Sequence, residues 1–359
     1  MGESANTKRQ TLVSPEKAVA MVDRMSDLPE SLMCHILWFL PTKEAVATSI
    51  LSSSWKSLWK LVPRLDLDVN TIKDSWSYGD VSFQHIVSRV LAQQELLEAA
   101  PTSTCGSEAS HHLQTLRLKC SLGHACSRLN TWLRAAAARE VKELDLEICY
   151  TPWVWGGEHL ELARSVFSCC RTLMVLKLSG DIEIDIGIDD RTSSVQFPCL
   201  KILQLLEIIY TQEDSDSFSR LPFGCPVLED LTFTINLVRV DYKTHDPDWH
   251  VLLDLLQMAP NLETLVVANK GYICFDIHKF CWKEPPGDDS DYLWPRLTSF
   301  YYRRFEGLKH EVDSIKYILK KARVLKRVTI QVAGRESKES VHEKISMFPR
   351  RSTCLLTVE

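Results

Sequence analysis

The stretch PVLEDLTF, at residues 226–233, carries the pattern from which the fold follows. Its apolar residues Leu228, Leu231 and Phe233 follow the spacing apolar-x-x-apolar-x-apolar. Four copies precede it and three follow it, with starts 27 to 35 residues apart. These copies are Leu113-Leu116-Leu118, Val141-Leu144-Leu146, Leu173-Leu176-Leu178, Leu200-Leu203-Leu205, Leu262-Leu265-Val267, Leu297-Phe300-Tyr302 and Leu325-Val328-Ile330. A period of this size is typical of repeat proteins.

The repeat predicts a solenoid with a parallel sheet. The first apolar residue of each copy is expected on a turn, and the next two point inward from a short strand. One repeat cannot bury its apolar side alone, whereas stacked repeats can. Eight copies resemble a divergent leucine-rich repeat, and an unrelated α/β domain with Leu-rich strands is the alternative.

A different pattern precedes the repeats. Helical projection from Leu32 places Phe39, Ile36, Leu40, Met33 and Leu37 with it on an arc of about 160°. Pro41 ends this predicted helix, and Thr42 is expected to cap the next, which carries Ala45, Val46, Ile50 and Leu51. A third helix is predicted over Ser54–Leu61. Three short helices with this much apolar surface must contact either the solenoid or another chain.

These residues resemble a known family. The segments MSDLPESL (25–32), HIL (35–37), FLPTKEAVATS (39–49) and WKSLW (55–59) are similar to the F-box of plant F-box/leucine-rich-repeat proteins. VPRLDLD (62–68) matches as well. Near the other end, CWKEP (281–285), FEG (305–307), YILKKAR (317–323) and MFPR (347–350) resemble the FBD module of that family. The family usually has basic residues where this chain has Ser53 and Ser54.

The resemblance implies an α+β chain with a three-helix F-box, a leucine-rich-repeat solenoid and a C-terminal FBD-type cap. We expect a disordered tail over residues 1–22, the F-box over 23–68 and the repeats over 111–280. Residues 69–110 are expected to be a linker with one helix, Ser82–Ala99, and residues 281–359 an FBD-like module.

The resemblance also implies a function. The F-box would dock onto a Skp-type adaptor, itself held by a cullin and a RING protein, and the solenoid would bind a protein substrate for ubiquitination. The predicted adaptor-binding residues are Leu28, Pro29, Leu32, Ile36, Leu37, Leu40, Pro41, Val46 and Trp55. Ile50 and Leu58 are expected in the core of the F-box. The predicted substrate-binding residues flank inward positions of the strands: Arg117, Asp145, Lys177, Gln204, Thr232 and Tyr301.

Other classes of function fit less well. A repeat scaffold that binds partners without ubiquitin transfer is the main alternative. An enzyme is disfavoured because the sequence shows no convergent acid, base and nucleophile set, so no catalytic residue and no cofactor is predicted. The acidic stretch 181–190 lacks the spacing of a calcium loop and is expected to be a strand with one wet face. His245 and His250 fit no zinc signature, so no metal is predicted.

The composition indicates the cellular compartment and disfavours some classes of partner. The chain has 359 residues, 45% of them hydrophobic, and 12 cysteines without a C-x-x-C pair. Buried reduced thiols, no signal peptide and no membrane span are expected, so the chain is assigned to the cytoplasm, the nucleus or both. A net charge of −5 does not favour nucleic acid.

The charge is nevertheless uneven. Residues 296–359 hold 15 basic and 7 acidic residues, so this end carries +8 while the rest carries −13. The densest cluster is Lys320, Lys321, Arg323, Lys326 and Arg327. It is either a solvated helix and strand edge or an electrostatic contact with an acidic substrate or with the acidic body of the chain.

Overall fold

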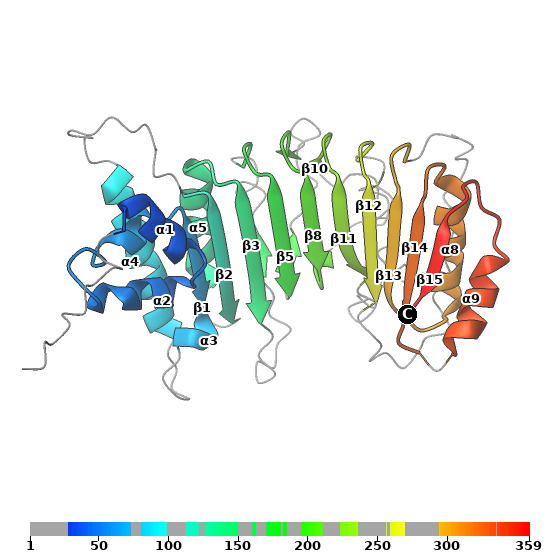
Figure 1. Ribbon diagram of the computed structural model, residues 1–359, viewed down its shortest axis with the longest axis horizontal. Helices are drawn as coiled ribbons and strands as arrows, with labels where there is room; N and C mark the ends of the chain where they lie inside the picture. The colour runs from blue at the N-terminus through cyan, green and yellow to red at the C-terminus, as the bar shows by residue number, and fades with distance from the viewer. Residues whose placement is uncertain are drawn as a thin grey trace, which may run out of the picture.

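The computed structural model describes residues 28–72, 80–98, 113–121, 126–149, 160–162, 170–180, 182–184, 195–210, 223–235, 256, 259–269, 294–334 and 336–359. Ten parallel strands form one sheet whose spatial order follows the chain (Figure 1). They are β1 (Arg64–Asp68), β2 (Thr115–Ser121), β3 (Glu143–Cys149), β5 (Val175–Gly180), β8 (Ile202–Leu206), β11 (Asp230–Ile235), β12 (Thr264–Asn269), β13 (Ser299–Phe305), β14 (Arg327–Val332) and β15 (Leu355–Val358).

The eight predicted repeats supply the eight strands from β2 to β14 of this sheet. The two outer strands were not predicted as repeats. β1 carries the same spacing in Val62, Leu65 and Leu67, but it lies inside the segment assigned to the F-box. β15 lacks the first apolar residue, because Thr353 stands there, and its inward Leu356 and Val358 are only partly buried.

The register of the strands explains the core. The second apolar residue of each copy pairs with its equivalent in the next strand, so one continuous apolar row crosses the sheet. That row is Leu65, Leu116, Leu144, Leu176, Leu203, Leu231, Leu265, Phe300, Val328 and Leu356. Each repeat therefore buries its neighbour's side chains, as stacking requires.

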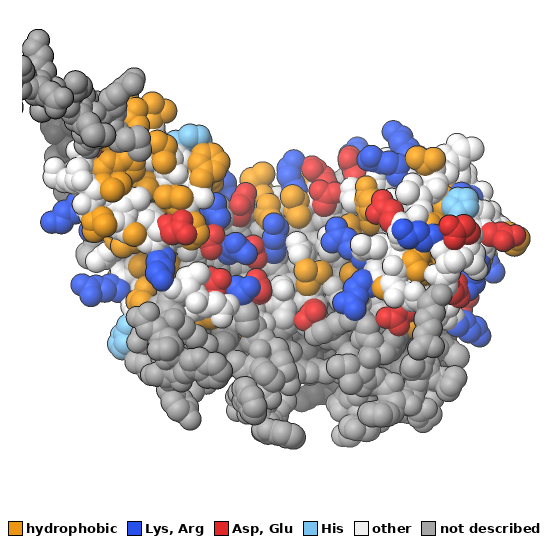
Figure 2. Space-filling model, turned by 60° about the horizontal axis from the view of Figure 1, so that its bottom comes forward, with side chains coloured by type: hydrophobic (Ala, Val, Ile, Leu, Met, Phe, Trp, Pro, Cys, Tyr) orange, Lys and Arg blue, Asp and Glu red, His pale blue; other side chains and the backbone are white. Residues whose placement is uncertain are grey.

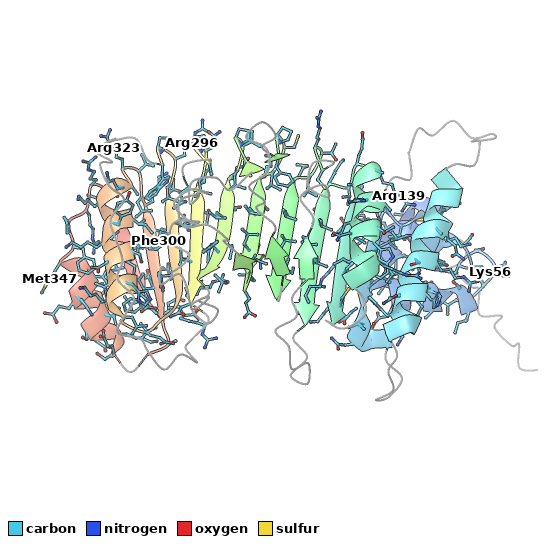
Figure 3. All side chains as sticks on the ribbon, turned by 180° about the vertical axis from the view of Figure 1, so that it is seen from behind. Lys56, Arg139, Arg296, Phe300, Arg323 and Met347 are labelled. Atoms are coloured by element: carbon cyan, nitrogen blue, oxygen red, sulfur yellow. The ribbon has the colours of Figure 1, made fainter. Side chains whose placement is uncertain are left out.

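The back of the sheet faces the viewer in Figure 3, where helices lie at its two ends. They are α4 (Asp80–Glu98), α5 (Cys126–Ala138) and α8 (Lys309–Lys321). α4 is the helix predicted in the linker, and its Phe83, Val87 and Leu91 are buried. Short strands also lie in two small parallel sheets, β4 (Leu160–Leu162) with β6 (Ile182–Ile184) and β9 (Ile209–Tyr210), and β7 (Val195–Gln196) with β10 (Phe223–Gly224). The face of the large sheet turned to the viewer in Figure 1 is called the front face below.

The first described residues form a helical unit beside β1. It contains α1 (Glu30–Trp38), α2 (Thr42–Ala47), and the 3-10 helices η1 (Thr48–Ile50) and η2 (Leu58–Leu61), and a short α3 (Val69–Ile72) follows β1. The prediction of a third α-helix over Ser54–Leu61 is wrong, and only its last part, Leu58–Leu61, is helical, as the 3-10 helix η2. Turns occupy residues 53–57, where the N–H groups of Trp55 and Lys56 donate to the carbonyls of Ser52 and Ser53. Consecutive serines disfavour a helix because their hydroxyls compete for backbone groups.

A buried carboxylate joins three elements at the C-terminal end. Glu311, in the first turn of α8, accepts hydrogen bonds from Asn269 Nδ2 at 2.8 Å and from the hydroxyl of Tyr302 at 3.3 Å. Its other oxygen accepts from the backbone N–H groups of Glu306 at 3.0 Å and Leu308 at 2.9 Å. A single residue thus ties α8 to β12 and β13. Beyond it, α9 (Lys338–Ser346) packs against β15 and buries Val341 and Ile345.

Several sequence-based expectations concern residues that the structure does not describe: the tail 1–22, the segment 281–285, His245 and His250, and all of 181–190 except β6. Of the described cysteines, Cys34, Cys120, Cys170, Cys199, Cys225 and Cys354 are free thiols. Cys120, Cys170 and Cys225 are buried as expected, whereas Cys34 and Cys354 are half-buried and Cys199 is exposed, contrary to the expectation of buried thiols. No helix in the described part of the chain is both long and apolar enough to cross a lipid bilayer.

Candidate functional site

The N-terminal helical unit has a small core of its own. Leu37 on α1 packs with Trp55, Leu58 and Trp59, and all four are buried. Pro29 starts α1, and its carbonyl accepts from the N–H groups of Leu32 and Met33 at 2.9 and 3.1 Å. This core positions α1 and α2 so that their opposite sides face outward.

The outward side is apolar. Hydrophobic side chains gather over this end of the molecule in Figure 2. We define the apolar face by its six exposed large hydrophobic residues: Leu32, Ile36, Phe39, Val46, Ile50 and Leu51. The described part of the chain contains only five other exposed large hydrophobic residues. Exposed apolar side chains are therefore concentrated on this face. Exposed apolar patches of this kind mark interaction sites.

Most of the predicted adaptor-binding residues lie at this surface. Leu32, Ile36 and Val46 are exposed, as are Pro29 and Pro41, and Leu28 and Leu40 are half-buried. Leu37 and Trp55 are exceptions, because each is at most 2% exposed and belongs to the core of the unit. Their placement on the contact surface was wrong, and in the structure they support that surface from beneath.

The opposite error concerns Ile50. It was expected in the core but is 88% exposed, because α2 ends at Ala47 and a 3-10 turn carries Ile50 away from α1. Leu58, the other residue expected in the core, is buried. Phe39 and Leu51 were missed as surface residues. Phe39 is 69% exposed, and its position three residues after Ile36 and seven after Leu32 is a helical spacing that could have identified it.

A polar junction fixes the helical unit to the sheet. The hydroxyl of Thr42 accepts a hydrogen bond from the backbone N–H of Asp66 on β1 at 2.8 Å, so Thr42 does not cap α2 as predicted. Arg64 donates to the carbonyl of Trp38 at the end of α1 at 3.2 Å and to Asp66 at 2.8 Å. Lys43 also donates to the carbonyl of Thr71 in α3. The apolar face therefore has a defined position relative to the sheet.

The predicted substrate-binding residues form one row across the front face. Their strands pair in register, so the row runs Asp66, Arg117, Asp145, Lys177, Gln204, Thr232, Val266 and Tyr301. The sequence predicted six of these positions. It did not predict Asp66, which belongs to the unrecognised strand β1, or Val266.

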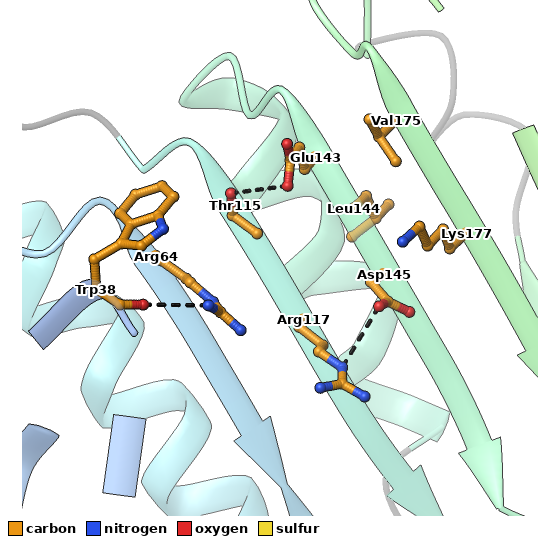
Figure 4. A pocket seen from close by; sticks show the side chains of 9 residues that line it. All are labelled: Trp38, Arg64, Thr115, Arg117, Glu143, Leu144, Asp145, Val175 and Lys177. Atoms are coloured by element: carbon orange, nitrogen blue, oxygen red, sulfur yellow. Dashed lines mark hydrogen bonds and ion pairs between the residues drawn. The ribbon is translucent and has the colours of Figure 1, made fainter. Parts of the chain in front are cut away.

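A pocket of about 370 Å³ lies where this row meets α1 (Figure 4). It is lined by Trp38, Arg64, Thr115, Arg117, Glu143, Leu144, Asp145, Val175 and Lys177. Trp38 comes from the end of α1, and the other residues come from the first four strands of the sheet. The pocket is therefore formed jointly by the helical unit and the sheet.

Charges alternate along the row in this pocket. Arg117 lies between two carboxylates, with its Nη1 3.6 Å from Asp66 and its Nε 3.5 Å from Asp145. Burial raises the pKa of the Asp145 carboxyl, and the nearby Arg117 and Lys177 oppose that rise. Two residues further along the same strands, on the same face, Lys119 pairs with Glu147 at 2.6 Å. Alternating donors and acceptors suit recognition of a polar peptide.

The described residues contain no group of three or more His, Cys, Asp or Glu side chains placed to hold a metal ion. The arrangement thus has two surfaces with the polar junction between them. One is the apolar face, and the other is a charged groove, which consists of the pocket in Figure 4 and the row Asp66, Arg117, Asp145 and Lys177 along it.

Comparison with known families supports this organisation. The F-box domain family matches residues 25–67, and the FBD family matches residues 293–330. The LRR repeats of the FBD-associated F-box protein At5g56370 match residues 129–246. F-box proteins are in general substrate receptors that bind a Skp-type adaptor, and F-box/LRR proteins are typically not catalytic.

Curated relatives come from Arabidopsis thaliana. F-box/FBD/LRR-repeat protein At5g56420 is 35% identical over 217 residues, which cover 59% of this chain and 44% of the relative. F-box/LRR-repeat protein At3g59190 is 34% identical over 216 residues, 58% of this chain and 49% of the relative. F-box/FBD/LRR-repeat protein At4g26340 is 32% identical over 254 residues, 70% of this chain and 50% of the relative. The chain thus spans about half the length of the curated relatives it matches.

These matches confirm the resemblance predicted from the sequence. The chain carries an F-box, leucine-rich repeats and an FBD module, and its relatives are Arabidopsis F-box/FBD/LRR-repeat proteins.

Proposed function

We propose that this chain is the substrate-recognition subunit of an SCF-type E3 ubiquitin ligase. The apolar face of the F-box docks onto a Skp-type adaptor, through which a cullin and a RING protein are recruited. The front face of the solenoid binds the target protein. The chain supplies no catalytic group in this proposal.

The observation that carries the proposal is the exposure of the apolar face. Leu32 is 50% and Phe39 69% exposed, although the chain has a large sheet against which such side chains could pack. Burying them in a partner is favourable at about 25 cal/mol for each Å² of apolar surface. Because they lie on one side of α1, one partner can cover them together.

The charged groove is the proposed site for the target. Its row of alternating charges, from Asp66 to Lys177, offers both donors and acceptors to a polar segment. The further row residues Gln204, Thr232 and Tyr301 extend the contact surface along the sheet. The groove begins at Trp38 of the F-box, so a target bound there is held close to the adaptor. Such proximity raises the effective concentration of target lysines near the ubiquitin-conjugating enzyme.

The compartment belongs to the same proposal. We place the ligase in the cytoplasm, the nucleus or both, where reduced thiols such as the buried Cys120, Cys170 and Cys225 persist.

Co-purification with a plant Skp-type adaptor tests the docking step. The triple variant L32A/I36A/F39A removes three side chains of the apolar face, and we expect its adaptor affinity to fall about tenfold or more. The solenoid should keep its circular dichroism spectrum, because all three side chains are exposed in the structure.

A matched control removes apolar side chains elsewhere. In I86A/M174A both residues are, like Ile36, between one third and two fifths exposed but lie outside the F-box, so adaptor binding should not change. If L32A/I36A/F39A binds the adaptor as well as the unaltered chain, the apolar face is not the docking surface. If the unaltered chain recovers neither adaptor nor cullin, the alternative of a repeat scaffold without ubiquitin transfer is supported.

A further inference from the structure

The last strand of the large sheet has an outer edge with which none of the described residues pairs. β15 is hydrogen-bonded to β14 on one side, and it is the outermost strand at the end opposite the helical unit (Figure 1). The other end of the sheet differs, because α2 lies against β1 and Thr42 accepts the backbone N–H of Asp66. The helical unit therefore covers one end of the sheet, and β15 forms the other.

The hydrogen bonds to β14 show which backbone groups of β15 face outward. The N–H groups of Leu355 and Glu359 each donate to a carbonyl of the segment 326–330, at 2.9 Å. Consecutive residues of a strand direct their backbone groups to alternate sides. Leu356 and Val358 therefore direct both N–H and C=O away from β14, toward the outer edge.

The side chains of β15 are also less buried than those of its neighbour. Leu356 and Val358 occupy inward positions but are only half-buried, whereas their register partners Val328 and Ile330 are at most 1% exposed. Leu355, on the front face, is 67% exposed. Burial in this sheet comes from neighbouring strands, so one further strand would complete it here as elsewhere.

The sequence of β15 does not oppose such pairing. Outer strands of natural sheets commonly carry charges or proline that prevent association, and β15, with the sequence LLTV, has neither. Five exposed large hydrophobic residues lie outside the apolar face, and Val324, Met347 and Leu355 at this end of the molecule are three of them. Figure 3 shows Met347 at the same end. The outer edge of β15 thus has the properties of a strand-pairing site.

We propose that β15 pairs in antiparallel orientation with β15 of a second copy of this chain. A two-fold axis presents the same surface on both copies, and each copy supplies the outward N–H and C=O groups that the other lacks. The two sheets then continue into one another across the axis. Leu355 of each copy lies beside this axis and loses much of its exposure to water.

The charges around the edge favour the antiparallel orientation. Lys326 and Arg327, both exposed, stand where β14 begins, whereas Glu306 and Glu359 stand where β13 and β15 end. An antiparallel pair brings the beginning of the strands in one copy opposite their end in the other. Basic residues then face acidic ones, while a parallel pair would place like charges together.

This inference does not depend on the proposed ligase role, since it concerns the opposite end of the molecule. The helical units lie at the two far ends of such a dimer, so the apolar face and the charged groove stay accessible. An edge of four residues is smaller than a standard protein interface. We therefore expect a reversible dimer with a dissociation constant on the order of 10 μM.

Sedimentation equilibrium of the full chain between about 1 and 200 μM tests the proposal. It is measured in the variant L32A/I36A/F39A as well, so that association through the apolar face can be recognised. We expect a monomer–dimer equilibrium in both proteins. Hydrogen exchange of the peptide 352–359 should be slower at the higher concentration, because the N–H groups of Leu356 and Val358 become hydrogen-bonded.

The decisive variant is L355K, which places two like charges beside the axis. It should weaken dimerisation about tenfold or more, and the chain should stay folded because Leu355 is exposed. A second variant, V358P, removes an outward N–H but none of the bonds to β14, and it should also weaken the dimer. The matched control M174K adds the same charge at an exposed residue before β5, and its effect should be less than about twofold.

Three results would overturn the proposal. A chain that stays monomeric over the whole concentration range has no such interface. Equal losses in L355K and M174K would show an effect of net charge alone. A dimer that L32A/I36A/F39A abolishes would be formed through the apolar face and not through β15.

Discussion

Leu37 and Phe39 lie two residues apart on and just after α1, yet one is fully buried and the other is 69% exposed. Helical geometry turns successive residues by about 100°, so a difference of two positions moves a side chain to the other side of the helix. The contact surface of the F-box is accordingly a property of individual positions. Phe39 is an expected anchor for the adaptor, and Leu37 is part of the support.

His310 is a second residue whose surroundings decide its behaviour. Burial lowers the pKa of its imidazole from 6.5 to about 4, because the charged form loses its hydration. The unfolded chain therefore binds more protons than the folded chain between pH 6.5 and pH 4. The stability that comes from neutral His310 is complete above pH 6.5 and decreases as the pH falls.

We expect the substitution H310Q to remove this dependence. In the unaltered chain the free energy of unfolding should drop by about 3 kcal/mol from this group between pH 7 and pH 4. The buried Glu311, whose pKa is raised by burial, acts in the opposite direction at acid pH and is present in both proteins. Urea unfolding at a series of pH values measures the difference, with H342Q, at an exposed position on α9, as the control. Parallel pH profiles for H310Q and the unaltered chain would contradict the assignment.

At the scale of elements, the joint between α2 and β1 connects the two functional surfaces. Thr42 is 5% exposed, and its hydroxyl receives the N–H of Asp66 on the outer edge of the sheet. A buried donor without a partner costs about 1–3 kcal/mol. This hydrogen bond therefore helps to hold α2 against β1. In that position α2 lies along an edge of the sheet that would otherwise be open.

The variant T42V tests this joint, since valine has the shape of threonine but no acceptor. We expect it to lower the free energy of unfolding by about 1–2 kcal/mol and to speed amide exchange at Asp66. Thr71 offers the control, because its hydroxyl is exposed and donates to Asp68, so water can replace that bond in T71V. The joint is unimportant if T42V and T71V lose the same amount of stability.

At the scale of the whole molecule, a single apolar row passes through ten strands. Each strand contributes one side chain to it, and each side chain contacts those of its neighbours. Stability in such a repeat protein depends on interfaces between adjacent repeats. A substitution in the middle of the row should therefore destabilise the repeats on both sides of it.

Leu203, on the central strand β8, is the position to test. L203A should lower the free energy of unfolding by about 2–5 kcal/mol, because it leaves a cavity between two repeats. Its neighbour Gln204 points to the front face, so Q204A should cost less than about 1 kcal/mol. Urea unfolding followed by circular dichroism compares them. If L203A is as stable as Q204A, the row does not couple the repeats.

The strands and their faces could be predicted from the sequence, whereas the burial of individual residues in the helical unit could not. The spacing of Leu228, Leu231 and Phe233 predicts a strand wherever it recurs, because alternation of two residues is local geometry. It also predicts that Arg117 and Asp145 share one face. Burial of Trp55 and exposure of Ile50 were assigned wrongly, since helical arcs describe one helix and not its neighbours. Trp55 is buried within the turns that replace the predicted third helix, and Ile50 is exposed in the 3-10 turn that follows α2.

The sequence by itself determined the parallel repeat architecture, the polar row on its front face and the kinship with F-box/FBD/LRR-repeat proteins, because each depends on residue types at short, regular spacings. Only the tertiary structure decided that β1 and β15 complete the sheet, that Trp38 lines a pocket with Arg64 and Lys177, and that Glu311 joins α8 to β12 and β13. These features bring together residues that are distant in the chain, and strand pairing in three dimensions sets their distances.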